Sequence, residues 1–328
     1  MQKKQPNTLF GKPGRLPAKK DPRVLTFSKY IDIAKLKNVP KKLNWATKVK
    51  RSWGMMSNWT LSDCTCAAAG HMIECWTANS KKEYVIQDKA VLKAFIALSG
   101  YDPATGKNDN PIYMSDALKY WRKNGIGKHK IKAYATINHK DYAVMRAAIY
   151  LFGGVYVGLS LPETIKGQHI WEVSAGALTG KKKRGSFGGH TVNVVGYDDQ
   201  YVTCISWGKK QKMTWKFWDT YCDELYAIIT EDFLRDNKNP IGLNLASLEA
   251  DLLSTTREKI TVKKELNSIK KNINATKIQK KVAGTHGLNM GKTATELKKK
   301  STKKIVSNKP KPAAKKKISA GNSGRGVR

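Results

Sequence analysis

Residues 58–67 of the chain read NWTLSDCTCA, and they place Cys64 near the start of an expected helix. The helix is predicted from Ser62 to about Asn79, because Ser62 or Asp63 can cap it and the alanines and spaced apolar residues that follow favour it. A helix N-terminus carries partial positive charge and free N–H groups, which favour a thiolate over a thiol. Cys64 is therefore a candidate nucleophile; the alternative is a buried cysteine that only packs.

A second stretch, GGHTVNVVGY at residues 188–197, places His190 at the start of an apolar strand. An imidazole can take the proton of a thiol near neutral pH and later return it to a leaving group. Taken alone, His190 could equally be a satisfied histidine at a strand edge, with the two glycines before it forming a tight turn. A cysteine opening a helix, followed much later by a histidine opening a strand, indicates a Cys–His hydrolase site.

These segments resemble the papain-like cysteine peptidase superfamily, whose nucleophile begins the central helix and whose histidine begins a strand of the second lobe. The resemblance spans roughly Trp45 to Phe233. It implies that Asn58, at the position of the family's oxyanion glutamine, donates together with the Cys64 backbone N–H to a developing oxyanion. It also implies that Thr65 and Trp207 line the wall of the site.

The chain departs from the family at the residue that orients the histidine. Residues 206–208 match the family's Ser-Trp-Gly segment, but Ile205 stands where the family has an asparagine. Ile205 cannot accept the imidazole N–H, so a backbone carbonyl, Ser206 or a water remain as alternatives. Thr65 also replaces the tryptophan that follows the nucleophile in well-known members. The chain is thus expected to be a divergent member.

The remaining pattern predicts an α+β fold in which helices cluster early and strands late. With the family resemblance this implies a two-lobed papain-like cysteine-hydrolase fold, with a helical lobe followed by an antiparallel β lobe. Further helices are predicted over residues 88–98, 115–124 and 141–151, and strands over residues 130–137, 155–159, 191–197, 201–207 and 225–229.

Charge divides the chain more sharply than any other property. Residues 257–328 hold 22 Lys or Arg against three acidic residues, a net charge of +19 within the +36 of the whole chain, and they contain no aromatic residue. Such a segment cannot bury enough apolar surface to offset its ordering entropy. We therefore expect a basic extended arm at 1–22, a papain-like domain at 23–238, a short helix or linker at 239–256, and a disordered Lys-rich tail at 257–328.

The tail predicts nonspecific binding to nucleic acid or another polyanion, since phosphate neutralisation needs no folded reader. A solubilising or linker extension is the alternative. The five cysteines form no obvious disulfide framework and the N-terminus has no apolar secretory core, so an intracellular, reducing or virion-associated location is expected, with no membrane segment. No cofactor and no metal site is predicted, and His71 is interpreted as structural.

The sequence therefore favours a thiol hydrolase of peptide or isopeptide bonds that acts on a protein or peptide substrate. The main alternative is a catalytically degenerate papain-like structural protein associated with nucleic acid, viral or chromosomal. A transglutaminase-like acyl transferase is a third possibility. It needs an acid after the histidine strand, for which Asp219 is the nearby candidate.

Overall fold

The computed structural model describes residues 10–19, 21–22, 24–36, 39–80 and 83–233. The expected tail at 257–328 and the short helix or linker expected at 239–256 lie outside the described residues, as do residues 1–9 of the arm.

Five α-helices lie in this part of the chain, and four of them were predicted. Their ends follow from local chemistry. Asp141 accepts a hydrogen bond from the backbone of Val144, and Gly153 ends the same helix with a φ of 72°, a conformation that favours glycine. The helix not predicted from sequence begins after Thr214, whose side chain accepts from the backbone of Phe217 at 3.2 Å. The helices are α1 (Cys64–Ser80), α2 (Asp88–Ser99), α3 (Met114–Asn124), α4 (Tyr142–Phe152) and α5 (Trp215–Tyr221).

The strands form one nine-stranded sheet in the order β1-β3-β9-β4-β6-β7-β8-β5, with β2 also paired to β6. Neighbours are antiparallel except for β1 with β3 and β5 with β8. Strand β8 was not predicted, because its sequence KKQKMT shows no apolar alternation. The strands are β1 (Leu25–Thr26), β2 (Leu43–Asn44), β3 (Ala133–Thr136), β4 (Val155–Leu161), β5 (Ile170–Trp171), β6 (Gly188–Tyr197), β7 (Tyr201–Ser206), β8 (Lys209–Thr214) and β9 (Cys222–Ile229).

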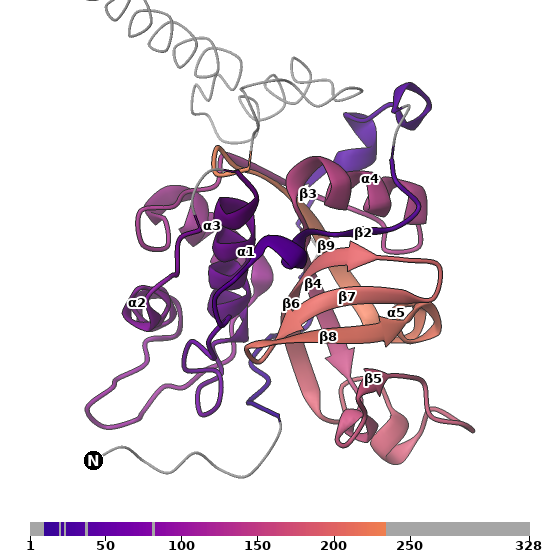
Figure 1. Ribbon diagram of the computed structural model, residues 1–328. Coiled ribbons are helices and arrows are strands. Elements are labelled where there is room, and N and C mark those ends of the chain that lie inside the picture. Colours follow the sequence, from indigo (N-terminus) through magenta and orange to yellow (C-terminus); the bar gives the residue numbers. More distant parts are fainter. Residues whose placement is uncertain (1–9, 20, 23, 37–38, 81–82, 234–328) are drawn as a thin grey trace, which may run out of the picture. The chain divides into compact units, whose positions relative to one another are not determined.

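Helix α1 is buried on nearly all sides, with α2 and α3 next to it on the same side of the sheet (Figure 1). Its side chains share a core with Trp121 of α3, whose ring stacks on Trp76 at 5.5 Å, and with Tyr156 of β4. A second core joins the sheet to α4 and α5. Because α1 packs chiefly along β6, the beginning of the helix and the beginning of the strand can meet. The α+β fold with a helical part preceding most of the sheet is confirmed.

A two-residue turn joins β7 to β8. Ser206 pairs with Lys209 across the hairpin, and the two residues between them, Trp207 and Gly208, have φ values of 48° and 67°. Positive φ at both central positions fits the right-handed twist of a hairpin, but it is strained for a tryptophan. The turn fixes the direction of the Trp207 side chain.

All five cysteines are buried and free. No helix within the described ranges is long and apolar enough to cross a membrane.

Candidate active site

Cys64 and His190 start two elements that pack on each other. Cys64 is the first residue of α1 and His190 the third residue of β6, and their exposed fractions are 0% and 1%. The backbone of Thr191, the residue after His190, hydrogen-bonds to the Cys64 thiol. The fold therefore brings the predicted nucleophile and the beginning of the histidine strand together.

The ring of His190 is held from one edge and one face. Nε2 lies 2.9 Å from the hydroxyl oxygen of Ser206, and the ring stacks on Trp207 with centroids 4.3 Å apart and planes at 24°. Nδ1 is buried and has no hydrogen-bond partner among the residues that the structure describes. Ser206, one of three alternatives from the sequence, is thus the side chain that hydrogen-bonds to the imidazole.

Ile205 takes no part in this contact because neighbouring residues of a strand face opposite ways. Its side chain packs into a small cluster with Trp53, Cys75 and Val195. The departure from the family pattern therefore moves the histidine's polar partner one position along β7.

Asn58 lies on a constrained loop. Met56 and Ser57 before it have φ values of 53° and 74°, which non-glycine residues rarely adopt. The Asn58 side-chain amide donates to the carbonyls of Lys12, at 2.9 Å, and Leu61, at 3.0 Å. The predicted oxyanion donor thus already holds a peptide carbonyl, supplied by the N-terminal part of this chain.

Residues 10–16, which we call the strap, cover the site. The backbone N–H groups of Gly14 and Arg15 donate to the carbonyl of Gly189 at 3.0 and 2.9 Å, and Gly189 directly precedes His190. Gly14 and Leu16 pair with the backbone of Ile112 on the other side. The strap is therefore an extended peptide held through its backbone between two parts of the fold.

Close packing explains the glycines of the strap. A Cβ on Gly14 would overlap the backbone of Ser62, and a Cβ on Gly11 would overlap the carbonyl of Asn58 and the ring of Trp207. Opposite the strap, a Cβ on Gly189 would overlap the carbonyl of Arg15. Both surfaces must lack side chains where they touch.

Burial decides the charge states beneath the strap. It raises the pKa of Cys64 to about 11, although hydrogen bonds from the backbones of Thr191 and Gly14 act in the opposite direction. Burial lowers the pKa of His190 to about 3, and the positive charge of Arg15 adds to this. Both groups are neutral at pH 7 in the covered site, so desolvation outweighs the helix N-terminus that the sequence led us to expect would favour a thiolate.

Asp63 lies just before α1. Burial raises the pKa of its carboxyl well above the usual value, against the opposing effect of the Asn58 amide. Its backbone carbonyl accepts from Cys66 and Ala67 and so begins the helix.

Thr65, predicted as a wall residue, is fully buried in the first turn of α1, where its carbonyl accepts from the Tyr156 hydroxyl at 2.6 Å. His71, interpreted as structural from the sequence, is buried within α1. Its Nε2 lies 3.0 Å from the carbonyl of Gly54, which anchors the loop before Asn58, and burial lowers its pKa to about 4.

Asp219 does not contact His190 through any hydrogen bond found in the described residues. Its carboxylate accepts from the Tyr142 hydroxyl and pairs with Lys140. The transglutaminase-like alternative therefore gains no support. No group of three or more His, Cys, Asp or Glu side chains in the described ranges could hold a metal ion.

Sequence reasoning did not find the strap, nor the acids that receive Arg15. Asp223 and Glu224 open strand β9 and pair with the Arg15 guanidinium at 2.8 and 3.1 Å. The available signal was weak: two adjacent acids at the head of an otherwise apolar strand, and an arginine about 200 positions earlier.

Comparison with known proteins identifies the type of fold. No family model matches the chain, and no curated protein matches its sequence. Among solved structures, xylellain, a cysteine protease from Xylella fastidiosa, superposes with a TM-score of 0.51 at 15% identity over 69% of this chain and 98% of its own. Procathepsin B S9 from Trypanosoma congolense gives a TM-score of 0.49 at 11% identity, over 67% of this chain and 86% of that one. With the order of Cys64 on α1 and His190 on β6, this likeness shows that the chain has the papain-like fold of the cysteine proteases, in a divergent form.

Proposed function

We propose that the protein is a thiol-dependent hydrolase of peptide or isopeptide bonds, with Cys64 as nucleophile and His190 as base. The observation that carries the proposal is the strap. An extended peptide lies against the thiol, paired through its backbone to Gly189, with a carbonyl accepting from the Asn58 amide. A cleft that holds a peptide in this way beside a cysteine and a histidine is suited to act on peptides.

The proposed proton path follows from the two ring nitrogens of His190. Nδ1 has no hydrogen-bond partner among the described residues, the Cys64 thiol included, and in this proposal it takes the thiol proton. This requires that Nε2 carries a hydrogen and donates it to the Ser206 oxygen. The Cys64 sulfur then bonds to the carbonyl carbon of the substrate. The Asn58 amide and the Cys64 backbone N–H hold the resulting oxyanion.

The second half of the reaction reverses the proton transfer. The tetrahedral intermediate collapses as His190 returns the proton to the leaving amine, which leaves an acyl group on Cys64. Water, losing a proton to His190, then attacks the thioester carbonyl. The second tetrahedral intermediate releases the carboxylic acid as His190 returns the proton to the Cys64 sulfur, which restores the thiol. Thr65 and Trp207 remain the proposed wall of the site, with Trp207 fixing the imidazole plane.

The covered site is the resting form in this proposal. With the strap in place Cys64 is fully buried and its pKa is about 11, so hydrolysis requires the strap to leave. Leaving lets water reach the thiol and the imidazole, which removes the largest cause of both pKa shifts.

The test uses the full chain carrying Gly14→Ala, whose methyl group displaces the strap by overlap with Ser62. This variant is incubated with a mixed peptide library, and the products and any acyl group on Cys64 are located by mass spectrometry. We expect cleaved peptides, abolished by adding Cys64→Ala and retained with Cys75→Ala as the matched control. Cleavage that persists without Cys64, or none at all from a folded Gly14→Ala protein, would contradict the proposal.

We also propose that residues 257–328 bind nucleic acid or another polyanion without sequence preference. The support is the net charge of +19 on this segment. Changing Lys298, Lys299, Lys300 and Lys315 to Gln in the full chain should weaken binding to a random DNA duplex and reduce its salt dependence. Four Lys→Gln changes on the folded domain, at Lys41, Lys89, Lys93 and Lys128, are the control. An equal loss in both variants would assign the binding to overall charge instead.

A further inference from the structure

Arg15 is a buried cation supplied by the strap. Only 4% of its surface is exposed, and its backbone N–H donates to Gly189, next to His190. Gly14, one residue earlier, hydrogen-bonds to the Cys64 thiol through its backbone. The Arg15 side chain therefore leaves the strap immediately beside the proposed reacting atoms. Burying a guanidinium is costly unless it is paired, so its surroundings are informative.

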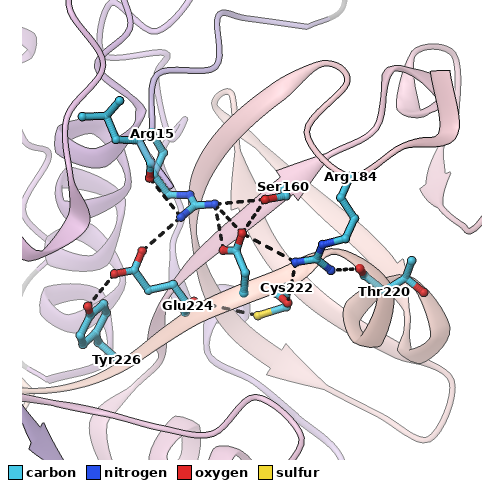
Figure 2. A network of polar contacts seen from close by, with 9 residues as sticks. Arg15, Ser160, Arg184, Thr220, Cys222, Glu224 and Tyr226 are labelled. Carbon is cyan, nitrogen blue, oxygen red and sulfur yellow. Dashed lines mark hydrogen bonds and ion pairs between the residues drawn. The ribbon is translucent and has the colours of Figure 1, made fainter. Parts of the chain in front are cut away.

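Two carboxylates and a hydroxyl receive the guanidinium. Nη1 lies 3.1 Å from Glu224 and Nη2 lies 2.8 Å from Asp223, and Nη2 also reaches the Ser160 hydroxyl at 3.5 Å. Figure 2 shows Arg15 pointing away from its backbone toward Glu224 on one side and Ser160 on the other. The planar fork of arginine can reach several oxygens at once, whereas a lysine ammonium is a single point of charge.

The floor of this pocket is shaped for a flat group. Gly158 of β4 lies under the guanidinium, where an added Cβ would stand 3.0 Å from both Cζ and Nε of Arg15. The same Cβ would stand 2.8 Å from the sulfur of Met114. Any side chain at this position would therefore fill the space that the guanidinium occupies.

The acids are also held by groups other than Arg15. The Tyr226 hydroxyl donates to Glu224 at 2.6 Å, and the Ser160 hydroxyl donates to Asp223. Arg184 approaches Asp223 at 3.7 Å and, as Figure 2 shows, is also bonded to the carbonyls of Thr220 and Cys222. The pocket thus keeps its polar geometry if Arg15 leaves, and such preorganisation lowers the cost of binding a replacement.

Departure of Arg15 leaves Glu224 without its cationic partner, whereas Asp223 keeps its contact with Arg184. The same two acids also line an open cavity of about 510 Å³, together with residues that follow the strap, among them Ala18, Val24 and Thr26. Once Arg15 has left, this acidic wall is accessible to an incoming ligand.

We propose that this pocket, formed by Gly158, Ser160, Asp223 and Glu224, is an arginine-selective subsite that takes an arginine side chain of a peptide substrate once Arg15 has left. The proposal rests on the proposed peptidase function, because only a peptidase would make the bound peptide a substrate. The pocket itself can be tested through binding alone. The substrate class is thus arginine-containing peptides, with the arginine close to the bond that Cys64 attacks.

The binding test uses the full chain with Cys64→Ala, Gly14→Ala and Arg15→Ala, in which the strap is displaced, its own arginine is absent and no cleavage can occur. The probe is the peptide FGKPGRLP, the sequence of residues 10–17, titrated by calorimetry against the same peptide with citrulline in place of arginine. Citrulline keeps the shape and removes the charge. We expect the arginine peptide to bind more than about tenfold tighter, because charge-assisted hydrogen bonds are lost in the citrulline peptide.

The matched variants assign the preference to the pocket. Adding Glu224→Gln should remove most of the difference between the two peptides, whereas Glu172→Gln, an exposed acid on another loop, should leave it unchanged. If Glu224→Gln does not fold, Asp223→Asn gives the same comparison, since Asp223 is 21% exposed and tolerates the change more readily. Equal binding of the two peptides, or a preference that survives both pocket variants, overturns the proposal.

Hydrolysis is measured separately with Cys64 restored. Selective binding without cleavage of any peptide would leave the pocket standing and contradict the proposed function. Cleavage with no preference for arginine would support the proposed function and contradict the arginine-selective pocket.

Discussion

The two ring nitrogens of His190 differ in their surroundings, and this difference indicates the role of Ser206. The Ser206 hydroxyl is 2.9 Å from Nε2 and leaves Nδ1 for the thiol proton. Replacing Ser206 by alanine frees the ring to choose the other tautomer or to turn about its bond, so we call Ser206 a positioning residue.

We expect Ser206→Ala to lower kcat by about 100-fold with little change in KM, since the substrate does not touch this hydroxyl. The measurement compares the two constants in the Gly14→Ala background, with Ser52→Ala as the control on an exposed serine. The pH at which kcat is half-maximal should also move, because the hydroxyl stabilises one protonation state. A parallel rise in KM with kcat unchanged would instead place Ser206 in substrate binding.

Cys64 gives a second test at the same scale. Burial raises its pKa from the ordinary 9.0 to about 11, so the thiol stays protonated until the solution is well above neutral. At pH 7 roughly one thiol in ten thousand is then ionised. We expect alkylation of Cys64 by iodoacetamide to be slow at pH 7 in the native chain and to rise about tenfold for each pH unit up to about 11. A fast reaction at pH 7 in the covered protein would show that the thiol is activated beneath the strap.

At the scale of elements, the strap and α1 compete for the same space above the thiol. The strap and the start of α1 fit together only because residue 14 is a glycine, since a Cβ at this position would overlap the backbone of Ser62. We expect Gly14→Ala to speed alkylation of Cys64 at pH 7 by at least about tenfold while Cys75 and Cys222 stay unreactive, since exposure restores the thiolate. Mass spectrometry of the modified peptides checks this, with Ala18→Ser on the same segment as the control. If the rate does not change, the strap does not control access.

The elements that carry the site were predictable because their signals are local. Helix α1 shows a cap, alanines and apolar spacing, and β6 is an apolar run after two glycines, so Cys64 and His190 could be placed from sequence. Strand β8 and helix α5 could not be predicted, because half of the strand is lysine and the helix is too short to show a period.

The strap was unpredictable for a different reason. Its residues FGKPGRL have no apolar pattern, and only the shape of the site explains why glycines are needed there. Its partners Gly189 and Glu224 lie far along the chain, and such tertiary contacts leave no periodic trace in a single sequence. Ser206 was within reach because the sequence narrowed the histidine's partner to a few alternatives.

For the whole molecule, buried ionisable groups set how stability depends on pH. His71 and His190 have folded pKa values of about 4 and about 3, below the ordinary 6.5. Below about pH 6.5 these two imidazoles therefore bind protons in the unfolded chain but not in the folded one. The free energy of unfolding falls as the pH falls through this range. Glu74 acts oppositely. Burial raises its pKa to about 8 from 4.5, so its contribution to stability is lost as pH rises through that interval.

The two trends oppose each other between pH 4.5 and 6.5, and we expect stability to be highest there. Above pH 6.5 only Glu74 and similar buried acids act, so the free energy of unfolding should fall toward pH 8. Glu74→Gln should remove part of this alkaline decline, whereas Glu172→Gln, an exposed acid, should not. Urea unfolding followed at pH 5, 6.5 and 8 checks the expectation. A free energy that rises from pH 6.5 to 8 would show that Glu74 is ionised in the folded protein.

The strap has one further consequence because it is joined to the domain it covers. A short tether holds a ligand at an effective concentration on the order of millimolar, whatever the protein concentration in solution. A free peptide must therefore outcompete a neighbour that never diffuses away, and its apparent affinity is reduced by the fraction of molecules in which the site is open. Dilution cannot uncover this site, whereas one cut in the chain between the strap and β1 would turn a permanent occupant into an ordinary inhibitor that washes out.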